Sequence, residues 1–147
     1  MNREILFKAK TEMIVRSYNN GLDDGIWVKG YLRCDCGMWL IYQFEYDRAD
    51  QVAYEVNPET ICQYTGLKDK NSKKIWENDI VKDSRGNLYK VFWQENYYQF
   101  AFICIKANDA LLFGAKWDLW SLAKNKDLEL QGSIFDNPEL LKEGIEE

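Results

Sequence analysis

Apolar and polar residues alternate along much of the chain, a pattern typical of half-buried β-strands. We expect a first strand over residues 3–9, in which Ile5, Phe7 and Ala9 share one face. Residues 12–18 form a second short apolar run. The other predicted strands are residues 26–33, 38–44, 52–56, 61–65, 80–82, 88–93, 97–105 and 128–135. The pattern therefore predicts a mainly β protein.

Turn-forming residues separate these strands and group two pairs of them into hairpins. Residues 34–37, which include a glycine, join the strands of the first predicted hairpin, residues 26–44. Residues 94–96 join the strands of the second predicted hairpin, residues 88–105. Gly66 marks a further tight turn between two strands.

A short helix is predicted near the C-terminus, at residues 136–142. Asn137 is a good N-cap residue, and Pro138 fits the first helical position. Glu139 places a negative charge in the first turn, where the helix dipole favours it. We expect Gly144 to end this helix.

Aromatic residues make up 15% of the chain, a proportion that supports the prediction of sheets. They are numerous for the core of a small protein, so some of them could lie in an interface between proteins. Plain core packing is the other interpretation, and both stay open here. The candidate interface residues are Trp93, Tyr97, Tyr98, Trp117 and Trp120.

The net charge of −5 is unevenly distributed along the chain. Residues 1–60 contain 7 basic and 10 acidic residues, for a net charge of −3. Residues 61–142 contain 12 basic and 11 acidic residues, for +1, and the last five residues add three acids. An acidic protein is not expected to bind nucleic acid strongly and non-specifically, but a local basic patch is compatible with binding.

Four lysines within seven residues, followed closely by a tryptophan, form the candidate basic site. Such a cluster could contact phosphates through its ammonium groups while a base stacks on the indole ring. A solvated turn whose lysines keep the protein soluble is the alternative interpretation. The candidate residues for binding nucleic acid or another partner are Lys68, Lys70, Lys73, Lys74 and Trp76, with Lys82 and Arg85.

The sequence lacks the residues that several kinds of catalysis require. It contains no histidine, which excludes Ser-His-Asp and Cys-His mechanisms and histidine metal ligands. Neither the Walker A loop nor GxGxxG occurs, so no phosphate-binding loop is indicated. Acidic pairs such as Asp23–Asp24 and Glu45–Asp47 are expected by chance at this acidic content. We therefore expect a protein without catalytic activity and without a cofactor.

The four cysteines do not form a typical metal-binding pattern. Cys34 and Cys36 are a close pair, whereas Cys62 and Cys104 stand alone. Structural zinc sites usually combine two CxxC pairs, so we expect reduced thiols and no metal. No signal-peptide pattern is present, and no segment approaches the roughly 18 apolar residues of a membrane span. The sequence therefore predicts a cytoplasmic protein that does not enter a membrane.

The order of these motifs resembles that of the YopX-like proteins of bacteriophages and prophages. Their pattern opens with a strand containing arginine, isoleucine and phenylalanine, like Arg3, Ile5 and Phe7 here. A tryptophan-led strand like residues 27–32 follows. The other similar blocks are residues 54–67, 68–81 and 128–141, in the same order.

The resemblance implies a mainly β fold with two subdomains. An N-terminal β subdomain, residues 1–60, would precede an SH3-like β-barrel with the terminal helix, residues 61–142, and an acidic tail, residues 143–147. It also implies an origin in a phage or prophage, but no biochemical activity. We expect a non-enzymatic binding module whose partner is a phage protein, a host protein or nucleic acid. The alternative is a homo-oligomeric structural or protein-interaction protein that does not bind nucleic acid.

Two residues depart from the family pattern, because Ser72 and Asn78 stand where glycine is usual. Such glycines usually adopt a positive φ, which asparagine tolerates better than most residues. We therefore expect Asn78 to preserve its turn and Asn71 to take the left-handed conformation in place of Ser72. We also expect the Asp79 side chain to accept backbone amide hydrogen bonds in its turn.

Overall fold

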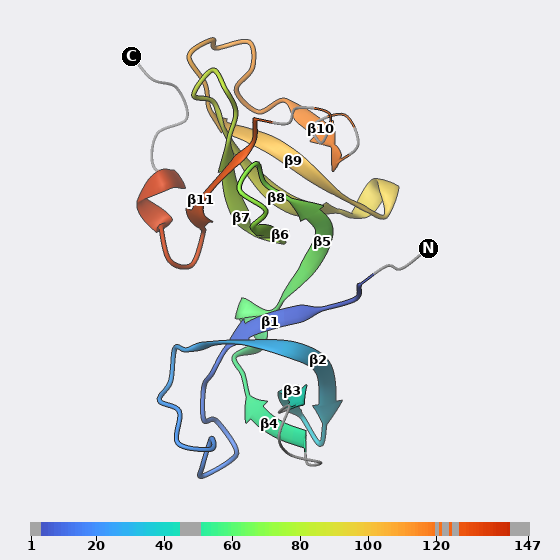
Figure 1. Ribbon diagram of the computed structural model, residues 1–147, viewed down its shortest axis with the longest axis vertical. Coiled ribbons are helices and arrows are strands. Elements are labelled where there is room, and N and C mark those ends of the chain that lie inside the picture. The colour runs from blue at the N-terminus through green and yellow to red at the C-terminus, as the bar shows by residue number, and fades with distance from the viewer. Residues whose placement is uncertain (1–3, 45–50, 120, 122–123, 125–126, 142–147) are drawn as a thin grey trace. The chain divides into compact units, whose positions relative to one another are not determined.

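The computed structural model describes residues 4–44, 51–119, 121, 124 and 127–141. It divides into two compact units, Met1–Tyr64 and Thr65–Glu147. Both units consist mainly of antiparallel strands, so the prediction of a mainly β protein is confirmed (Figure 1). The sequence suggested a boundary between residues 60 and 61, whereas this division falls four residues later, inside a strand.

The first unit is a sheet in which neighbouring strands follow the order β4-β3-β2-β1-β5. All the pairings recorded within it are antiparallel. Its strands are β1 (Phe7–Lys10), β2 (Trp27–Asp35), β3 (Met38–Phe44), β4 (Gln51–Glu55) and the beginning of β5 (Cys62–Lys68).

The predicted first hairpin is present and closes with a two-residue turn. Asp35 pairs with Met38 across the ends of β2 and β3. Between them Cys36 has φ 50° and Gly37 has φ 79°. Two successive left-handed residues are the requirement of a type I′ turn, whose twist matches that of the strands.

One face of this sheet forms the core of the first unit. Phe7 packs against that core, as its alternation with polar residues predicted. Ile5 does not share this position, because β1 begins only at Phe7 and Ile5 is 57% exposed. The buried core residues are Ala9, Val28, Ile41, Val52, Tyr54 and Val56.

The apolar run at residues 12–18 forms a loop held by a buried carboxylate rather than a strand. The Glu55 carboxylate accepts hydrogen bonds from the amides of Ile14, Val15 and Arg16 at 2.8–3.1 Å. The Asn19 side chain in turn hydrogen-bonds the backbone of Glu55. These bonds satisfy the buried charge, and they fix the loop while Ile14 and Val15 stay exposed.

The second unit contains a five-stranded sheet with the order β10-β9-β8-β7-β11. In the described residues this sheet is open, with β10 and β11 at its edges. The end of β5 pairs with β6 beside it. The remaining strands are β6 (Lys74–Trp76), β7 (Asp79–Lys82), β8 (Leu88–Gln94), β9 (Gln99–Lys106), β10 (Lys116–Asp118) and β11 (Glu129–Ser133).

The predicted second hairpin, β8–β9, is the centre of this unit. The 3-10 turn η2 (Glu95–Tyr97) joins its strands, and Tyr98 closes the turn with φ 51°. The hairpin supplies half of the buried core of the second unit. The core residues are Ile75, Val81, Tyr89, Val91, Phe102, Cys104, Ala107 and Leu128.

The predicted C-terminal helix is not confirmed as an α-helix. Pro138–Leu141 form a single 3-10 turn, η3. The amide of Leu140 donates to the backbone oxygen of Asn137 at 3.1 Å, so Asn137 does begin this turn. Gly144 and the acidic tail lie outside the described residues.

Within the described part of the chain, none of the helices has the length and apolar character that crossing a membrane requires.

Candidate functional site

Two turns of the second unit are built in the same way around an aspartate. In the Asp69 turn, residues 69–73, the Asp69 carboxylate accepts the amides of Asn71 and Lys73 at 2.8 and 2.9 Å. The Asp69 amide donates to the Lys73 carbonyl at 2.8 Å, and the Ser72 amide donates to the Asp69 carbonyl. The aspartate thereby satisfies the amides that such a tight turn leaves unpaired.

The Asp83 turn, residues 83–87, repeats every one of these bonds. The Asp83 carboxylate accepts the amides of Arg85 and Asn87, both at 2.9 Å. The Asp83 amide donates to the Asn87 carbonyl, and the Gly86 amide donates to the Asp83 carbonyl. In both turns the aspartate stands five positions before the first residue of the next strand, β6 or β8, and sequence reasoning missed this signal.

The fourth residue of each turn is left-handed, and this corrects one expectation. Ser72 has φ 64° and Gly86 has φ 86°, so Ser72 itself, and not Asn71, takes the left-handed position. Asn78 has φ 69° and preserves its turn as predicted. The Asp79 carboxylate accepts the Trp76 amide at 2.8 Å, which confirms the role predicted for Asp79.

We expect the substitution Ser72→Gly to stabilise the protein by about 0.5–1 kcal/mol. A non-glycine residue in the left-handed region carries a steric penalty of about 1–2 kcal/mol, which glycine removes. Glycine also makes the unfolded chain more flexible, and this offsets part of the gain in stability. Chemical denaturation of both proteins measures the difference. Ser84→Gly is the control, because Ser84 is exposed in the Asp83 turn and does not have a positive φ; this substitution should destabilise slightly.

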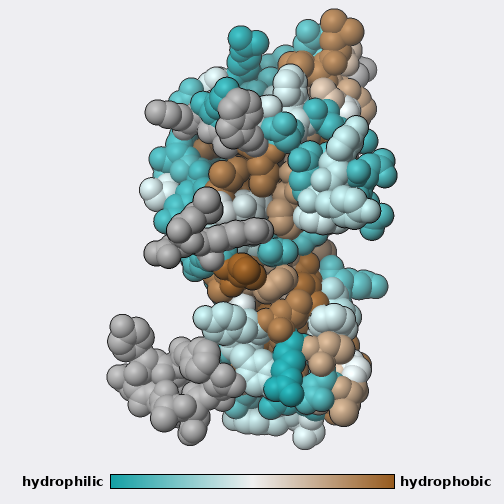
Figure 2. Space-filling model, turned by 90° about the vertical axis from the view of Figure 1, so that its right-hand side faces the viewer, coloured by the Kyte–Doolittle hydropathy of each residue, from teal (hydrophilic) through white to brown (hydrophobic). Residues whose placement is uncertain are grey.

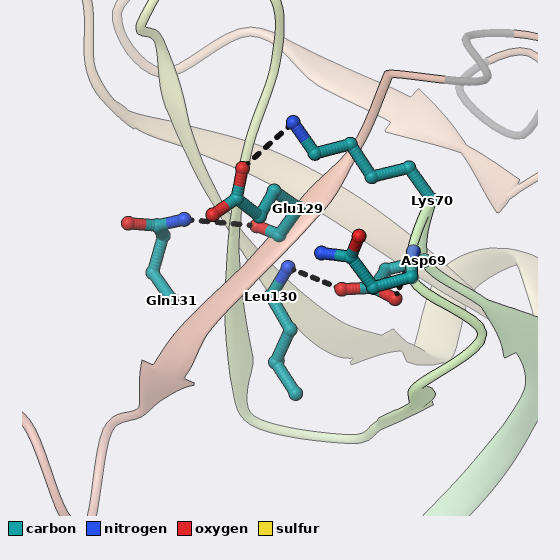
Figure 3. A network of polar contacts seen from close by, with 6 residues as sticks. Asp69, Lys70, Glu129, Leu130 and Gln131 are labelled. Atoms are coloured by element: carbon teal, nitrogen blue, oxygen red, sulfur yellow. Dashed lines mark hydrogen bonds and ion pairs between the residues drawn. The ribbon is translucent and has the colours of Figure 1, made fainter.

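A hydrogen bond and an ion pair join the Asp69 turn to β11, as Figure 3 shows. The second carboxylate oxygen of Asp69 accepts the amide of Leu130 at 2.9 Å. Lys70 Nζ lies 2.8 Å from Glu129 Oε2, and its amide donates to the Leu128 carbonyl. Burial alone raises the pKa of Asp69, but the amides around its carboxylate outweigh burial and lower it.

The structure separates the candidate basic residues into different environments. Lys70 and Lys73 are exposed in the Asp69 turn and Lys68 is exposed at the end of β5, whereas Lys74 and Lys82 are half-buried. Glu129 pairs with Lys70, and it lies opposite Lys82 in the pairing of β11 with β7. Trp76 is only 3% exposed, so its ring is not accessible to a base. The predicted stacking role of Trp76 is therefore wrong, because the ring packs inside the fold.

Arg85, the last residue of that candidate set, borders a pocket of about 410 Å3. The pocket lies between the Asp83 turn and the β9–β10 connection. Asn108 ties these segments together, because its side chain donates to the Arg85 carbonyl and its amide donates to Asn87. Apolar side chains of Leu112 and Trp117 line the pocket beside polar ones. The full lining is Asp83, Ser84, Arg85, Asn87, Tyr89, Leu112, Trp117 and Ser121.

Asp83 and Tyr89 form a polar network in this lining. The Tyr89 hydroxyl and the Asn87 side-chain amide each donate to Asp83 Oδ2 at 3.0 Å. Burial alone raises the pKa of Asp83, but hydrogen bonds from Asn87, Tyr89 and Arg85 outweigh it, so the pKa lies below its ordinary 3.8. Burial, and then the bond to Asp83, raise the pKa of Tyr89. At neutral pH the pocket therefore holds an ionised carboxylate with four donors already bound to it.

The predicted interface residues are exposed where the structure describes them. Tyr97 and Tyr98 are 68% and 83% exposed at the β8–β9 turn, and the nearby Trp93 is 43% exposed. Trp117 is 39% exposed, and Trp120 lies outside the described residues. Figure 2 shows apolar residues reaching the surface at the upper end of the view, in the second unit. Sequence analysis overlooked Leu111, which is 88% exposed in the β9–β10 connection.

The cysteines and acidic residues do not gather into a metal site in the described part of the chain. No group of three or more metal-binding side chains lies together there. Cys34 and Cys36 are exposed thiols at the β2–β3 turn, whereas Cys62 and Cys104 are buried. Burial raises the pKa of the Cys104 thiol, so this thiol is less reactive than an ordinary one.

These features define a mainly β protein whose surface carries two aspartate-centred turns, a pocket and exposed aromatic residues. The family model described as YopX protein matches residues 27–142, which is well over half of the chain. The chain belongs to the YopX family. A search of curated proteins gave no match.

Proposed function

We propose that this protein is a phage- or prophage-derived, non-enzymatic binding module that acts in the cytoplasm of a bacterial host. Its family supports the origin, and the family suggests no activity. The absence of histidine from the chain supports a binding role over acid–base or nucleophilic catalysis. The binding surface that we favour is the pocket lined by Arg85 and Trp117. Arg85 belongs to the candidate basic residues, and Trp117 belongs to the candidate interface residues.

The chemistry of this pocket suits a protein segment that carries an apolar side chain next to a carboxylate. Trp117 and Leu112 offer apolar surface, and Arg85 places a guanidinium at the exposed Asp83 turn. The Asp83 carboxylate already accepts four hydrogen bonds, so it has little capacity left to bind a cation. An anionic group therefore belongs at Arg85 and an apolar group at Trp117.

The lysine-rich turn supports a nucleic-acid function less well than this pocket supports a protein partner. Trp76 is buried and cannot stack a base. Glu129 pairs with Lys70, which leaves this lysine less available to a phosphate. Exposed Lys68 and Lys73 could still contact phosphates, but without a stacking ring that contact depends on charge alone.

Phenylacetate and its neutral analogue phenylacetamide test the pocket directly. Both carry an apolar ring, but only phenylacetate carries a carboxylate. We expect phenylacetate to shift the NMR signals of the Arg85 amide and the Trp117 indole. Phenylacetamide and the variant Arg85→Gln should each weaken this binding about tenfold or more, since a hydrogen bond to a charged group contributes about 1.5–3 kcal/mol.

Lys68→Gln is the matched control, because it removes an exposed positive charge from outside the pocket. It should leave phenylacetate binding unchanged. Equal binding of both probes, or signal changes spread over other surfaces, would contradict the proposed ligand class.

We also propose that the second unit is an SH3-like barrel. Four strands, β7 to β10, follow one another as a meander, and the last strand, β11, returns to pair with β7. That order of strands supports the proposal. Small barrels of this kind commonly bind ligands through their loops, which agrees with a pocket at the Asp83 turn.

A homo-oligomer is the second candidate function, and the exposed tyrosines at the β8–β9 turn favour it. Tyr97 and Tyr98 are exposed at this turn, and the ring of Trp93, near the end of β8, meets Phe100 edge-to-face at a centroid distance of 5.0 Å. Light scattering during size-exclusion chromatography, at low and high salt, measures the oligomeric state. A salt-stable oligomer that Tyr97→Asp dissociates supports this candidate, and a monomer in both conditions excludes it.

A further inference from the structure

The side of β1 and β2 that faces away from the core carries four basic residues, two aromatic ones and one acidic one. Lys8 pairs with Lys29, and Lys10 pairs with Trp27, in the antiparallel register of these strands. Residues opposite one another in such a pair point to the same side, and side chains two positions apart share that side. The residues of this face, which we call the β1–β2 face, are Lys8, Lys10, Trp27, Lys29, Tyr31, Arg33 and Asp35.

The opposite side of the same strands confirms this assignment. Ala9 and Val28 are buried core residues, and Phe7 and Leu32 pack against that core. They alternate with the members of the β1–β2 face along both strands. The β1–β2 face is therefore the side turned away from the core, and its Lys29, Tyr31 and Arg33 are exposed.

The charge of these two strands opposes that of the surrounding sequence. β1 and β2 contain four basic residues and one acidic residue, Asp35, for a net charge of +3. Residues 1–60 as a whole carry −3. Asp35 lies 4.0 Å from Arg33 with both side chains exposed, which is a weak pair in water. The positive charge is thus concentrated on one face of an otherwise acidic region.

The aromatic residues of this face have two different arrangements. The ammonium groups of Lys8 and Lys10 lie 4.5 and 5.3 Å from the centre of the Trp27 ring, within the range of a cation–π interaction. This contact orients both charges beside the ring. Tyr31 lies between Lys29 and Arg33 along β2 and is 58% exposed.

We propose that the β1–β2 face binds single-stranded nucleic acid. Lys8, Lys10, Lys29 and Arg33 would contact successive phosphates, and a base would stack on Tyr31. Sequence-independent binding to single strands uses two elements: cations that follow the phosphate backbone and aromatic rings on which bases stack. An acidic peptide would use the cations but would have no base to place on the tyrosine. This proposal is independent of the protein-binding pocket in the second unit.

Fluorescence anisotropy with labelled oligo(dU) and oligo(rU) of about 15 nucleotides tests the proposal, because this length matches the upper site size of small single-strand binders. We expect binding that weakens from about 50 to 200 mM salt, with a log–log slope of roughly −0.7 per phosphate contact. Tyr31→Ala should weaken it by about fivefold or more, as loss of base stacking does. Tighter binding of oligo(rU) or of oligo(dU) identifies RNA or DNA as the ligand.

The double charge reversal Lys29→Glu with Arg33→Glu should weaken binding by at least about tenfold and make the salt slope shallower by roughly 1.4. The matched control is Lys68→Glu with Lys73→Glu, which reverses two exposed lysines, one at the end of β5 and one in the Asp69 turn. It should retain binding to within a factor of about two. Thermal unfolding confirms that each variant stays folded.

Three results would overturn the proposal. The first is no binding at low salt. The second is loss of binding in the control but not in the Lys29 and Arg33 reversal, which would assign the contact to the Asp69 turn. The third is a polyglutamate peptide of equal charge that competes as well as the oligonucleotide, with no effect of Tyr31→Ala, which would make the face a site for acidic peptides.

Discussion

The substitution Gly30→Ala should destabilise the protein by about 3 kcal/mol, because a methyl group at this position collides with main-chain atoms. A Cβ on Gly30 would overlap the carbonyl oxygen of Tyr42 and lie 2.9 Å from its carbonyl carbon. It would also lie 3.2 Å from the side chain of the buried Ile41. Main-chain atoms within a sheet cannot move aside as a flexible side chain can, so β2 and β3 must separate locally.

Chemical denaturation measures this loss, and Gly25→Ala is a matched control. Gly25 has φ +82° and open space around its missing Cβ, so alanine there meets only the backbone strain of about 1–2 kcal/mol. We expect Gly30→Ala to lose clearly more stability than Gly25→Ala, although Gly30 does not have a positive φ. Equal stability losses in the two variants would show that the main chain of β3 moves away at Tyr42 at little energetic cost. A fall in the midpoint with an unchanged denaturant slope would confirm that the native state is the one affected.

Local sequence patterns predicted the strands and hairpins well because these elements depend on near neighbours. Residues 34–37 supply a Gly-containing turn between two apolar runs, and β2 and β3 meet there. The run at residues 12–18 was ambiguous, because its conformation depends on Glu55, some forty residues away. A strand pattern cannot reveal that a distant carboxylate binds its amides.

Prediction of the candidate site failed where burial or strand pairing decides what a residue can do. Trp76 follows four lysines in the sequence, but it packs inside the fold. Trp27 is distant from Lys8 and Lys10 in the sequence, but strand pairing brings their charges to its ring. Arg85 and Trp117 were assigned to different surfaces, and the Asn108 bonds bring their segments to one pocket.

The substitution Asp83→Ala should destabilise the second unit by about 3 kcal/mol. It would leave the buried Tyr89 hydroxyl and the Asn87 side chain without their shared acceptor, and two turn amides would lose theirs. Each buried group left without a partner costs about 1–3 kcal/mol, although relaxation and water recover part of the sum. Asp109→Ala is the control, because the exposed Asp109 accepts one amide, that of Leu111, and should cost about 0.5–1 kcal/mol.

A double-mutant cycle with Tyr89→Phe separates the hydroxyl contact from the rest of the turn. Once Asp83 is absent, the Tyr89 hydroxyl is a buried group without its acceptor, so its removal costs little. The stability losses of the two single variants should therefore sum to more than the stability loss of the double variant. Additive losses would mean that the 3.0 Å bond between these side chains contributes little.

The pH dependence of stability provides a test of the charge on Asp83. Its pKa lies below the ordinary 3.8 in the folded protein, so the stabilisation it provides is complete above that value. This stabilisation is lost as the pH falls through the lowered folded pKa, because protonation then removes the charge that the four donors bind. The wild-type protein should therefore lose stability steeply below about pH 4, and Asp83→Asn should be less stable at pH 7 but lose less on acidification. Parallel pH profiles for the two proteins would show that the donors bind the carboxyl group equally well in both protonation states.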